Sequence, residues 1–162
     1  MKTFLLILAA GLPLMFSTMA TSAQDRDAVV LTIDGDIENA SVRHFSIAQL
    51  EELGTEEIKT STPWHDGIVT FEGVPLARLM EHVGASGDNA AFLALNNYRT
   101  EIPLSDFATY HVILATRKDG NYMPVSDKGP LFVIYPFDSF NELKSELYYS
   151  RSAWQVRSIT IE

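Results

Sequence analysis

The sequence contains no cysteine, which excludes thiol chemistry of every kind. The chain therefore has no disulfides, no cysteine nucleophile and no thiolate ligand for a soft metal ion. A glycine-rich phosphate loop is also missing, because the nine glycines are dispersed and largely coincide with predicted turns and helix ends. Internal repeats and low-complexity segments are absent as well. The length and these absences together predict one domain of ordinary size.

Only one stretch is long and apolar, and it lies at the amino terminus. Lys2 precedes an apolar run at residues 4–16. A small-residue end follows, with TSA at residues 21–23 as the expected cleavage site and TMA at residues 18–20 as the second candidate. An uncleaved anchor helix is the alternative, but the run is shorter than the roughly 18 residues that a membrane span needs.

This segment and the net charge set the expected compartment and partners. We expect residues 1–23 to be a signal peptide cleaved near Ala23, and residues 24–162 to be a periplasmic domain. The formal net charge is −9, and loss of Lys2 with the signal makes it one unit more negative. Such a surface repels phosphate backbones and anionic membranes. The charge therefore argues against nucleic-acid binding and against membrane insertion of the mature chain.

The hydrophobic pattern predicts many short strands and a few short helices. Apolar and β-branched residues alternate or run together in seven segments. The predicted strands cover residues 28–33, 56–61, 67–73, 90–97, 111–117, 130–136 and 154–162. Helices are predicted at residues 46–53, 75–83 and 141–149. This pattern favours an α+β fold, a single mixed-sheet sandwich or barrel-like domain, over a doubly wound sheet.

The spacing of the histidines and serines gives little support for metal ligation or nucleophilic catalysis. The four histidines are His44, His65, His82 and His111. No two of them stand two or four residues apart, and no His-Glu-x-x-His motif occurs. No Gly-x-Ser-x-Gly elbow surrounds a serine, and the serines stand where turns and helix caps need them. The sequence therefore predicts neither a metal site nor a nucleophile.

Aromatic side chains recur beside polar groups at predicted turns and strand ends. The segments are STPWHDG (61–67), NNYR (96–99), IYPFDSF (134–140) and YYSRSAW (148–154). A planar heterocycle needs flat apolar faces for stacking and hydrogen-bonding groups around its rim, and these segments supply both. Packing into the core is the alternative for each ring taken singly. Composition alone does not name the ligand.

Five motifs follow one another over nearly all of residues 28–162. They read VTFEGVPLARLMEHVG, NNYRTEIPLSD, VILATRKDG, DKGPLFVIYP and SRSAWQVRSITI. In this order they resemble the molybdopterin-binding oxidoreductase domain, the sulfite-oxidase fold. The resemblance implies that a cysteine in the loop before F-x-G-V-P-L would bind molybdenum. This chain has Thr60, Ser61 and Thr62 there, and hydroxyls are poor ligands for a metal that prefers thiolate.

Two further departures from the family pattern concern partners for anionic groups. Residues 96–98 read Asn-Asn-Tyr where family enzymes commonly have Asp-Gly-Tyr, and the arginine that often follows Gly-Pro is missing from GPLFV. We therefore expect no molybdenum centre. The chain instead resembles small exported members of this fold that lack the cysteine. That resemblance implies binding of a free dihydropterin or tetrahydropterin, and its report to the periplasmic domain of an inner-membrane receptor controlling cyclic-di-GMP.

The aromatic residues of the predicted pterin site are Trp64, Tyr98 and Trp154. Trp64 and one of the other two are expected to stack on the pterin ring. By analogy with base stacking, such a contact contributes on the order of 1 to 3 kcal/mol. The ring would then be held without any covalent or redox step in the protein.

The polar residues of the predicted site would bind the rim of the ring. Asp138 is expected to accept from its donors, while Asn97 and Arg151 supply donors for its acceptors. His65 is a further candidate contact, and Asp66 is expected only to form the turn. Two other functions remain open: a molybdopterin-dependent oxidoreductase or oxidoreductase subunit with non-thiolate ligation, and an interaction module with an empty slot.

Overall fold

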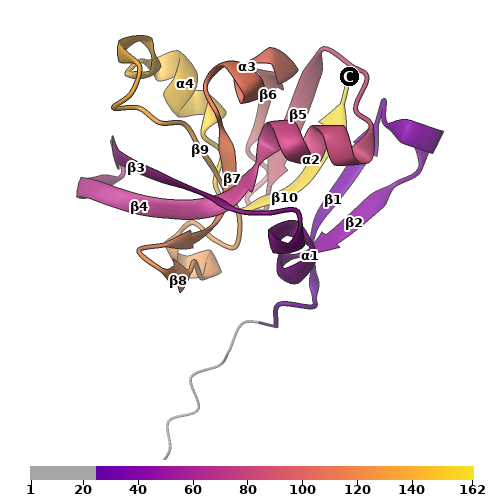
Figure 1. Ribbon diagram of the computed structural model, residues 1–162, viewed down its shortest axis with the longest axis horizontal. Coiled ribbons are helices and arrows are strands. Elements are labelled where there is room, and N and C mark those ends of the chain that lie inside the picture. Colours follow the sequence, from indigo (N-terminus) through magenta and orange to yellow (C-terminus); the bar gives the residue numbers. More distant parts are fainter. Residues whose placement is uncertain (1–24) are drawn as a thin grey trace, which may run out of the picture.

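The computed structural model describes residues 25–162, and the predicted signal peptide lies outside these residues. The described chain forms two five-stranded sheets with short helices around them (Figure 1). No helix within residues 25–162 has the length and apolar character needed to cross a membrane. The α+β mixed-sheet class predicted from the sequence is confirmed.

The first sheet brings the two ends of the described chain together. Its strands, in spatial order, are β2 (Arg43–Ser46), β1 (Val29–Gly35), β10 (Val156–Ile161), β5 (Asn89–Ala94) and β6 (Arg99–Pro103). Strands β1 and β10 pair in parallel, and the other neighbours are antiparallel. The tight β5–β6 turn projects from this sheet, and it carries one side of the candidate site.

The second sheet is antiparallel and contains a long hairpin. Its strands are β3 (Glu56–Thr62), β4 (His65–Pro75), β7 (Ile113–Lys118), β8 (Asn121–Tyr122) and β9 (Phe132–Ile134). Strand β7 pairs with β4, β8 and β9. The β3–β4 hairpin extends away from the first sheet, and α4 lies above its tip in the view of Figure 1.

Four short α-helices and three 3-10 turns connect the strands. The α-helices are α1 (Ile47–Glu52), α2 (Leu76–Val83), α3 (Leu104–Thr109) and α4 (Glu146–Arg151). The 3-10 turns are η1 (Glu38–Ala40), η2 (Val125–Asp127) and η3 (Asn141–Leu143). Ser46 begins α1 with a reciprocal capping box to Gln49. Gly84 ends α2 in the left-handed conformation that glycine adopts most easily.

The apolar core has a large part shared by both sheets and a smaller part under the β3–β4 hairpin. The smaller part contains Phe71 and Phe132, which are fully buried. Full burial of one such side chain contributes roughly 1.5 to 3 kcal/mol. Trp64 packs against both parts of the core although it stands at the hairpin turn. Its position is therefore fixed by packing and does not depend on a ligand.

Most predicted elements are present, and one prediction was wrong. Residues 141–149 do not form one helix, because Ser145 is extended (φ −145°) and separates η3 from α4. The strand predicted at residues 90–97 ends at Ala94, where the β5–β6 turn begins. The pattern also missed the short elements β2, β6, β8 and α3.

Candidate functional site

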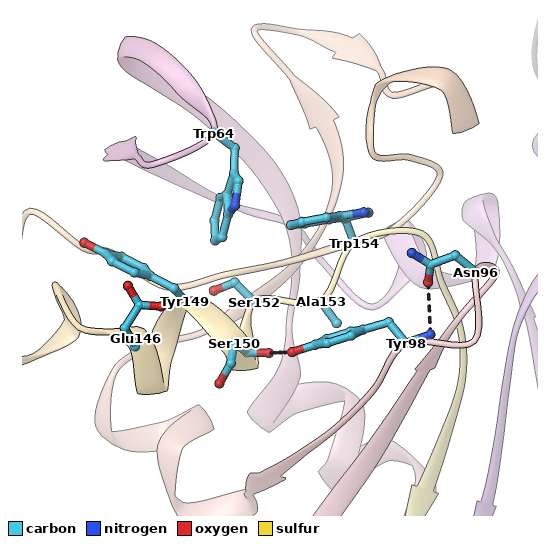
Figure 2. A pocket seen from close by; sticks show the side chains of 9 residues that line it. All are labelled: Trp64, Asn96, Tyr98, Glu146, Tyr149, Ser150, Ser152, Ala153 and Trp154. Atoms are coloured by element: carbon cyan, nitrogen blue, oxygen red, sulfur yellow. Dashed lines mark hydrogen bonds between the residues drawn. The ribbon is translucent and has the colours of Figure 1, made fainter.

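A cavity of about 280 Å³ opens between the β3–β4 hairpin, the β5–β6 turn and α4 with the segment that follows it (Figure 2). We call it the aromatic cavity. Its lining residues are Trp64, Asn96, Tyr98, Glu146, Tyr149, Ser150, Ser152, Ala153 and Trp154. Ligand pockets usually have volumes of about 300 to 1,000 Å³, so this one suits a single small ring system.

Trp64 forms the back of the aromatic cavity and is held by other rings. Its centroid lies 5.6 Å from that of Trp154 with an interplanar angle of 72°, and 6.1 Å from that of Tyr149 at 78°. A ligand stacked between two rings needs parallel walls about 7 Å apart, twice the usual contact distance. Trp64 and Trp154 cannot provide that pair of walls in this arrangement. Trp64 instead closes the inner end of the cavity.

Tyr98 and Trp154 line the cavity from two different segments, the β5–β6 turn and the segment after α4. Figure 2 draws both rings nearly edge-on, one above the other in that view. The Tyr98 hydroxyl donates to the Ser150 carbonyl at 2.6 Å, and the Tyr98 backbone N–H donates to the Asn96 side-chain oxygen at 3.0 Å. Tyr98 is 42% exposed, yet it is fixed at both ends. Tyr98 is therefore held in place without a ligand, and we call the part of the cavity that Tyr98 and Trp154 line the slot.

Two polar side chains that line the cavity, Glu146 and Asn96, have groups available to a ligand. Glu146 begins α4, and Figure 2 shows its carboxylate beside Tyr149, across the cavity from Asn96. Among the residues drawn there, no hydrogen bond reaches Glu146. The Asn96 side-chain oxygen is occupied by Tyr98, which leaves its amide nitrogen as a donor. No lining residue is basic, so the cavity presents one negative charge and no positive one.

The three hydroxyls of the loop expected to replace a metal-binding cysteine are all occupied. We call residues 60–62 the hydroxyl loop. Thr60 is fully buried, and its oxygen accepts from the Asp138 backbone N–H at 3.1 Å. The Ser61 hydroxyl donates to the Asp138 carboxylate at 2.7 Å. The Thr62 hydroxyl lies 2.8 Å from His65 Nδ1 and accepts from the Trp64 backbone N–H at 3.3 Å.

Two groups beside the hydroxyl loop, Asp138 and His65, have a pKa below the ordinary value. The pKa of Asp138 lies well below its usual range, because Lys144 and both the backbone N–H and hydroxyl of Ser61 hydrogen-bond to the charged carboxylate. Burial, and secondarily the charge of Lys118, lowers the pKa of His65. His65 is therefore favoured as the neutral imidazole.

A molybdenum cofactor does not fit these residues. The loop offers hydroxyls that are already hydrogen-bonded, and the aromatic cavity offers a carboxylate where the anionic oxo and phosphate groups would need cations. Within residues 25–162, no cluster of three or more histidine or acidic side chains is arranged to hold a metal ion. The arrangement suits reversible binding of an uncharged planar molecule.

The structure brings together part of the predicted site. Trp64, Tyr98 and Trp154 line the aromatic cavity, whereas His65, Asn97, Asp138 and Arg151 do not. The Asn97 side-chain oxygen accepts from Arg157 instead, and its backbone is left-handed (φ 65°), which asparagine tolerates. Asn97 occupies the turn position for which the family pattern has glycine, and its neighbour Asn96 supplies the amide to the cavity.

Arg151 has a supporting place behind the cavity. Its guanidinium pairs with Asp106 of α3 at 2.8 Å, and Asp106 also accepts from the Tyr135 hydroxyl at 2.9 Å. Burial, and then the charge of Asp106, raises the pKa of Tyr135. This buried group ties the end of α4 to the core. It holds the helix that carries Glu146 and Tyr149.

Asn96, Glu146 and Tyr149 line the cavity but were not predicted from the sequence. Asn96 and Tyr149 lie inside the aromatic segments 96–99 and 148–154, but neither was among the predicted site residues. Glu146 lies outside all four segments. A signal was present, because residues 146 and 149 are three apart and fall on the same face of a helix. The predicted helix at residues 141–149 contained both residues, but nothing in the sequence indicated that this face lines a cavity.

Comparison with known proteins identifies the fold. The model of the family described as "Oxidoreductase molybdopterin binding domain" matches residues 18–141. Among solved structures, the chain is similar to the sulfane dehydrogenase SoxCD from Paracoccus pantotrophus, with a TM-score of 0.63 and 17% sequence identity. That similarity covers 86% of this chain but only 39% of the SoxCD chain, and at this identity it concerns the fold alone. No curated protein sequence matches the chain.

Proposed function

The chain belongs to the oxidoreductase molybdopterin-binding domain family, and we propose that it is a non-redox member that binds a free reduced pterin in the aromatic cavity. One observation carries this proposal: the slot lined by Tyr98 and Trp154 has hydrogen-bonding groups beside it and no basic lining. The occupied hydroxyl loop supports it further, since this loop offers no thiolate to molybdenum.

Binding would combine stacking with hydrogen bonds at the rim. Each ring face that stacks on an aromatic side chain contributes on the order of 1 to 3 kcal/mol. Tyr98 is held in place before the ligand arrives, which reduces the entropic cost of binding. Trp64 would meet the inner edge of the ligand, while Glu146 and Asn96 would meet its polar rim.

We further propose that the protein acts in the periplasm and relays its ligand state to the periplasmic domain of an inner-membrane receptor controlling cyclic-di-GMP. The signal-like amino terminus and the family resemblance support this role. A ligand can shift a receptor only if the bound form presents a different surface or a different population of conformers. The β5–β6 turn and α4 flank the cavity, so they are the elements whose populations a ligand would change.

The test of binding is a titration of purified protein with 7,8-dihydroneopterin, followed by tryptophan fluorescence and calorimetry. We expect saturable binding, reduced by roughly fivefold or more in Tyr98→Ala because one stacking wall is lost. Tyr98→Phe is the matched control, since it keeps the ring and removes only the hydroxyl. Absence of binding at high micromolar pterin, with all three proteins alike, would refute the proposal.

A molybdopterin-dependent oxidoreductase is the second candidate, favoured by the family match and by the shared fold with a sulfane dehydrogenase. Metal analysis and mass spectrometry of protein purified from its native periplasm separate the two. Stoichiometric molybdenum would support the enzyme. A co-purified metal-free pterin would support the binding protein.

A further inference from the structure

Glu146 is an unusual component of a cavity walled by aromatic rings. Its carboxylate lies beside Tyr149, on the side of the aromatic cavity opposite Asn96, and no hydrogen bond from another cavity residue reaches it. The other carboxylate near this part of the molecule, that of Asp138, is bound by Ser61 and Lys144. Glu146 is therefore the acidic group left available to a ligand in this cavity.

We propose that Glu146 determines specificity by selecting planar heterocycles that present two adjacent N–H donors and no phosphate. This inference rests on the proposed function, and it names the ligand class that the same site accepts. An ionised carboxylate has two acceptor oxygens and no donor. Two parallel N–H groups on one edge of a ring match it as a bidentate pair, which is stronger and more directional than one neutral hydrogen bond.

The pterin edge carries this pattern. Its 2-amino group and the neighbouring N3–H point in the same direction. In a 7,8-dihydropterin the acceptors are N1, N5 and the 4-carbonyl oxygen, and N8–H is a further donor. On the side of the cavity opposite Glu146, the Asn96 amide nitrogen is a donor for an acceptor of the ligand. A lumazine has a carbonyl in place of the 2-amino group, which would direct an acceptor at the carboxylate.

The same charge excludes phosphorylated ligands. The cavity has no basic lining residue to balance a phosphate. Of the two lysines near this part of the molecule, Lys144 pairs with Asp138, and Lys128 lies over the Trp154 ring, 5.9 Å from its centre, without lining the cavity. Like charges brought together in a partly desolvated site repel each other strongly. Glu146 therefore separates free pterins from nucleotide-like or cofactor forms of the same ring.

The experiment compares three ligands in calorimetric titrations of the purified protein. The ligands are 7,8-dihydroneopterin, its 2-oxo lumazine analogue and dihydroneopterin triphosphate. We expect the wild type to prefer dihydroneopterin about tenfold or more over each of the others, as a charge-assisted bidentate contact predicts. Glu146→Gln should lose most of both preferences, because an amide can donate and carries no charge. Glu146→Asp keeps the charge and should still reject the triphosphate.

Glu142→Gln is the matched control, because it removes the same charge from an exposed glutamate that does not line the cavity. It should retain both preferences. If Glu146→Gln keeps the wild-type preferences, or if wild type binds the triphosphate as tightly as dihydroneopterin, this inference is wrong while the proposed function stands. If wild type binds none of the three ligands, the proposed function fails as well.

Discussion

The hydroxyl loop and the aromatic cavity lie next to each other, and they differ in whether their polar groups already have hydrogen-bond partners. Every hydroxyl of residues 60–62 is engaged with Asp138, His65 or nearby backbone. In the aromatic cavity, the Glu146 carboxylate and the Asn96 amide nitrogen remain free for a ligand. The loop in which the family resemblance predicts a metal ligand therefore supports the fold, while the polar groups of the neighbouring cavity are available to a ligand.

The energetic reason for this division is the cost of unsatisfied buried groups. A buried hydroxyl or N–H that loses its partner costs about 1 to 3 kcal/mol. Thr60 is fully buried, so its hydrogen bonds must be made within the protein. Glu146 is exposed, and water satisfies it until a ligand arrives. Burial thus determines which polar groups support the fold and which can recognise a ligand.

The largest expected effect comes from the anchor behind the aromatic cavity. Asp106→Ala leaves Arg151 without its carboxylate partner, and breaking a buried ion pair costs about 3 to 5 kcal/mol. We expect a loss of this size in the free energy of unfolding, measured by urea denaturation. Asp66→Ala removes an exposed carboxylate and should change that free energy by less than about 0.5 kcal/mol. Equal losses in the two variants would contradict the anchor.

Removing one wall of the slot should weaken binding. Trp154→Ala deletes a stacking face, and we expect the affinity for dihydroneopterin to fall by about 1 to 3 kcal/mol in titrations. Trp154→Phe keeps an aromatic face and should lose less. The prediction fails if the alanine variant remains folded by circular dichroism and binds as tightly as the wild type.

The hydroxyl loop should respond in the opposite way. Ser61→Ala removes the 2.7 Å hydrogen bond to Asp138, and we expect the free energy of unfolding to fall by about 1 kcal/mol. The affinity for dihydroneopterin should stay within about twofold of the wild type, because Ser61 does not line the cavity. A large loss of affinity with no loss of stability would show that the comparison between the two regions is wrong.

The smallest effect concerns stability in acid. The pKa of Asp138 is lowered in the folded protein by Lys144 and Ser61, so its contribution is present above the unfolded value of about 3.9 and is lost as pH falls below it. Asp138→Asn should therefore flatten the decline in unfolding free energy between about pH 5 and pH 2. Asp66→Asn is the control and should keep the wild-type slope. An unchanged slope in Asp138→Asn would contradict the assignment.

The sequence predicted the fold better than it predicted the site, because strands and helices follow from the pattern of neighbouring residues. Strands such as β7 and β10 can be predicted from the apolar pattern of neighbouring residues. The family resemblance extended that prediction to residues 28–162, and the family match over residues 18–141 confirmed the family and the fold class. The position of a side chain relative to a distant segment has no such local signature.

The residues of the cavity illustrate this limit. Trp64 and Trp154 could be selected because large aromatics beside polar turns are uncommon unless they pack or bind. The choice between Asn96 and Asn97 depended on the backbone of one turn, where residue 97 takes the left-handed conformation and points its amide to Arg157. The selection of Glu146 depended on which face of α4 borders the cavity, and the apolar pattern did not indicate this.

The hydrogen bond from the Tyr98 hydroxyl to the Ser150 carbonyl joins segments 52 residues apart in the sequence. Because Tyr98 also lines the slot, this hydrogen bond limits the thickness of a ligand that can bind without moving Tyr98. A dihydropterin ring is nearly flat, whereas a tetrahydropterin ring is puckered and thicker. Under the proposed function, a single tyrosine therefore makes binding sensitive to the oxidation state of the ligand.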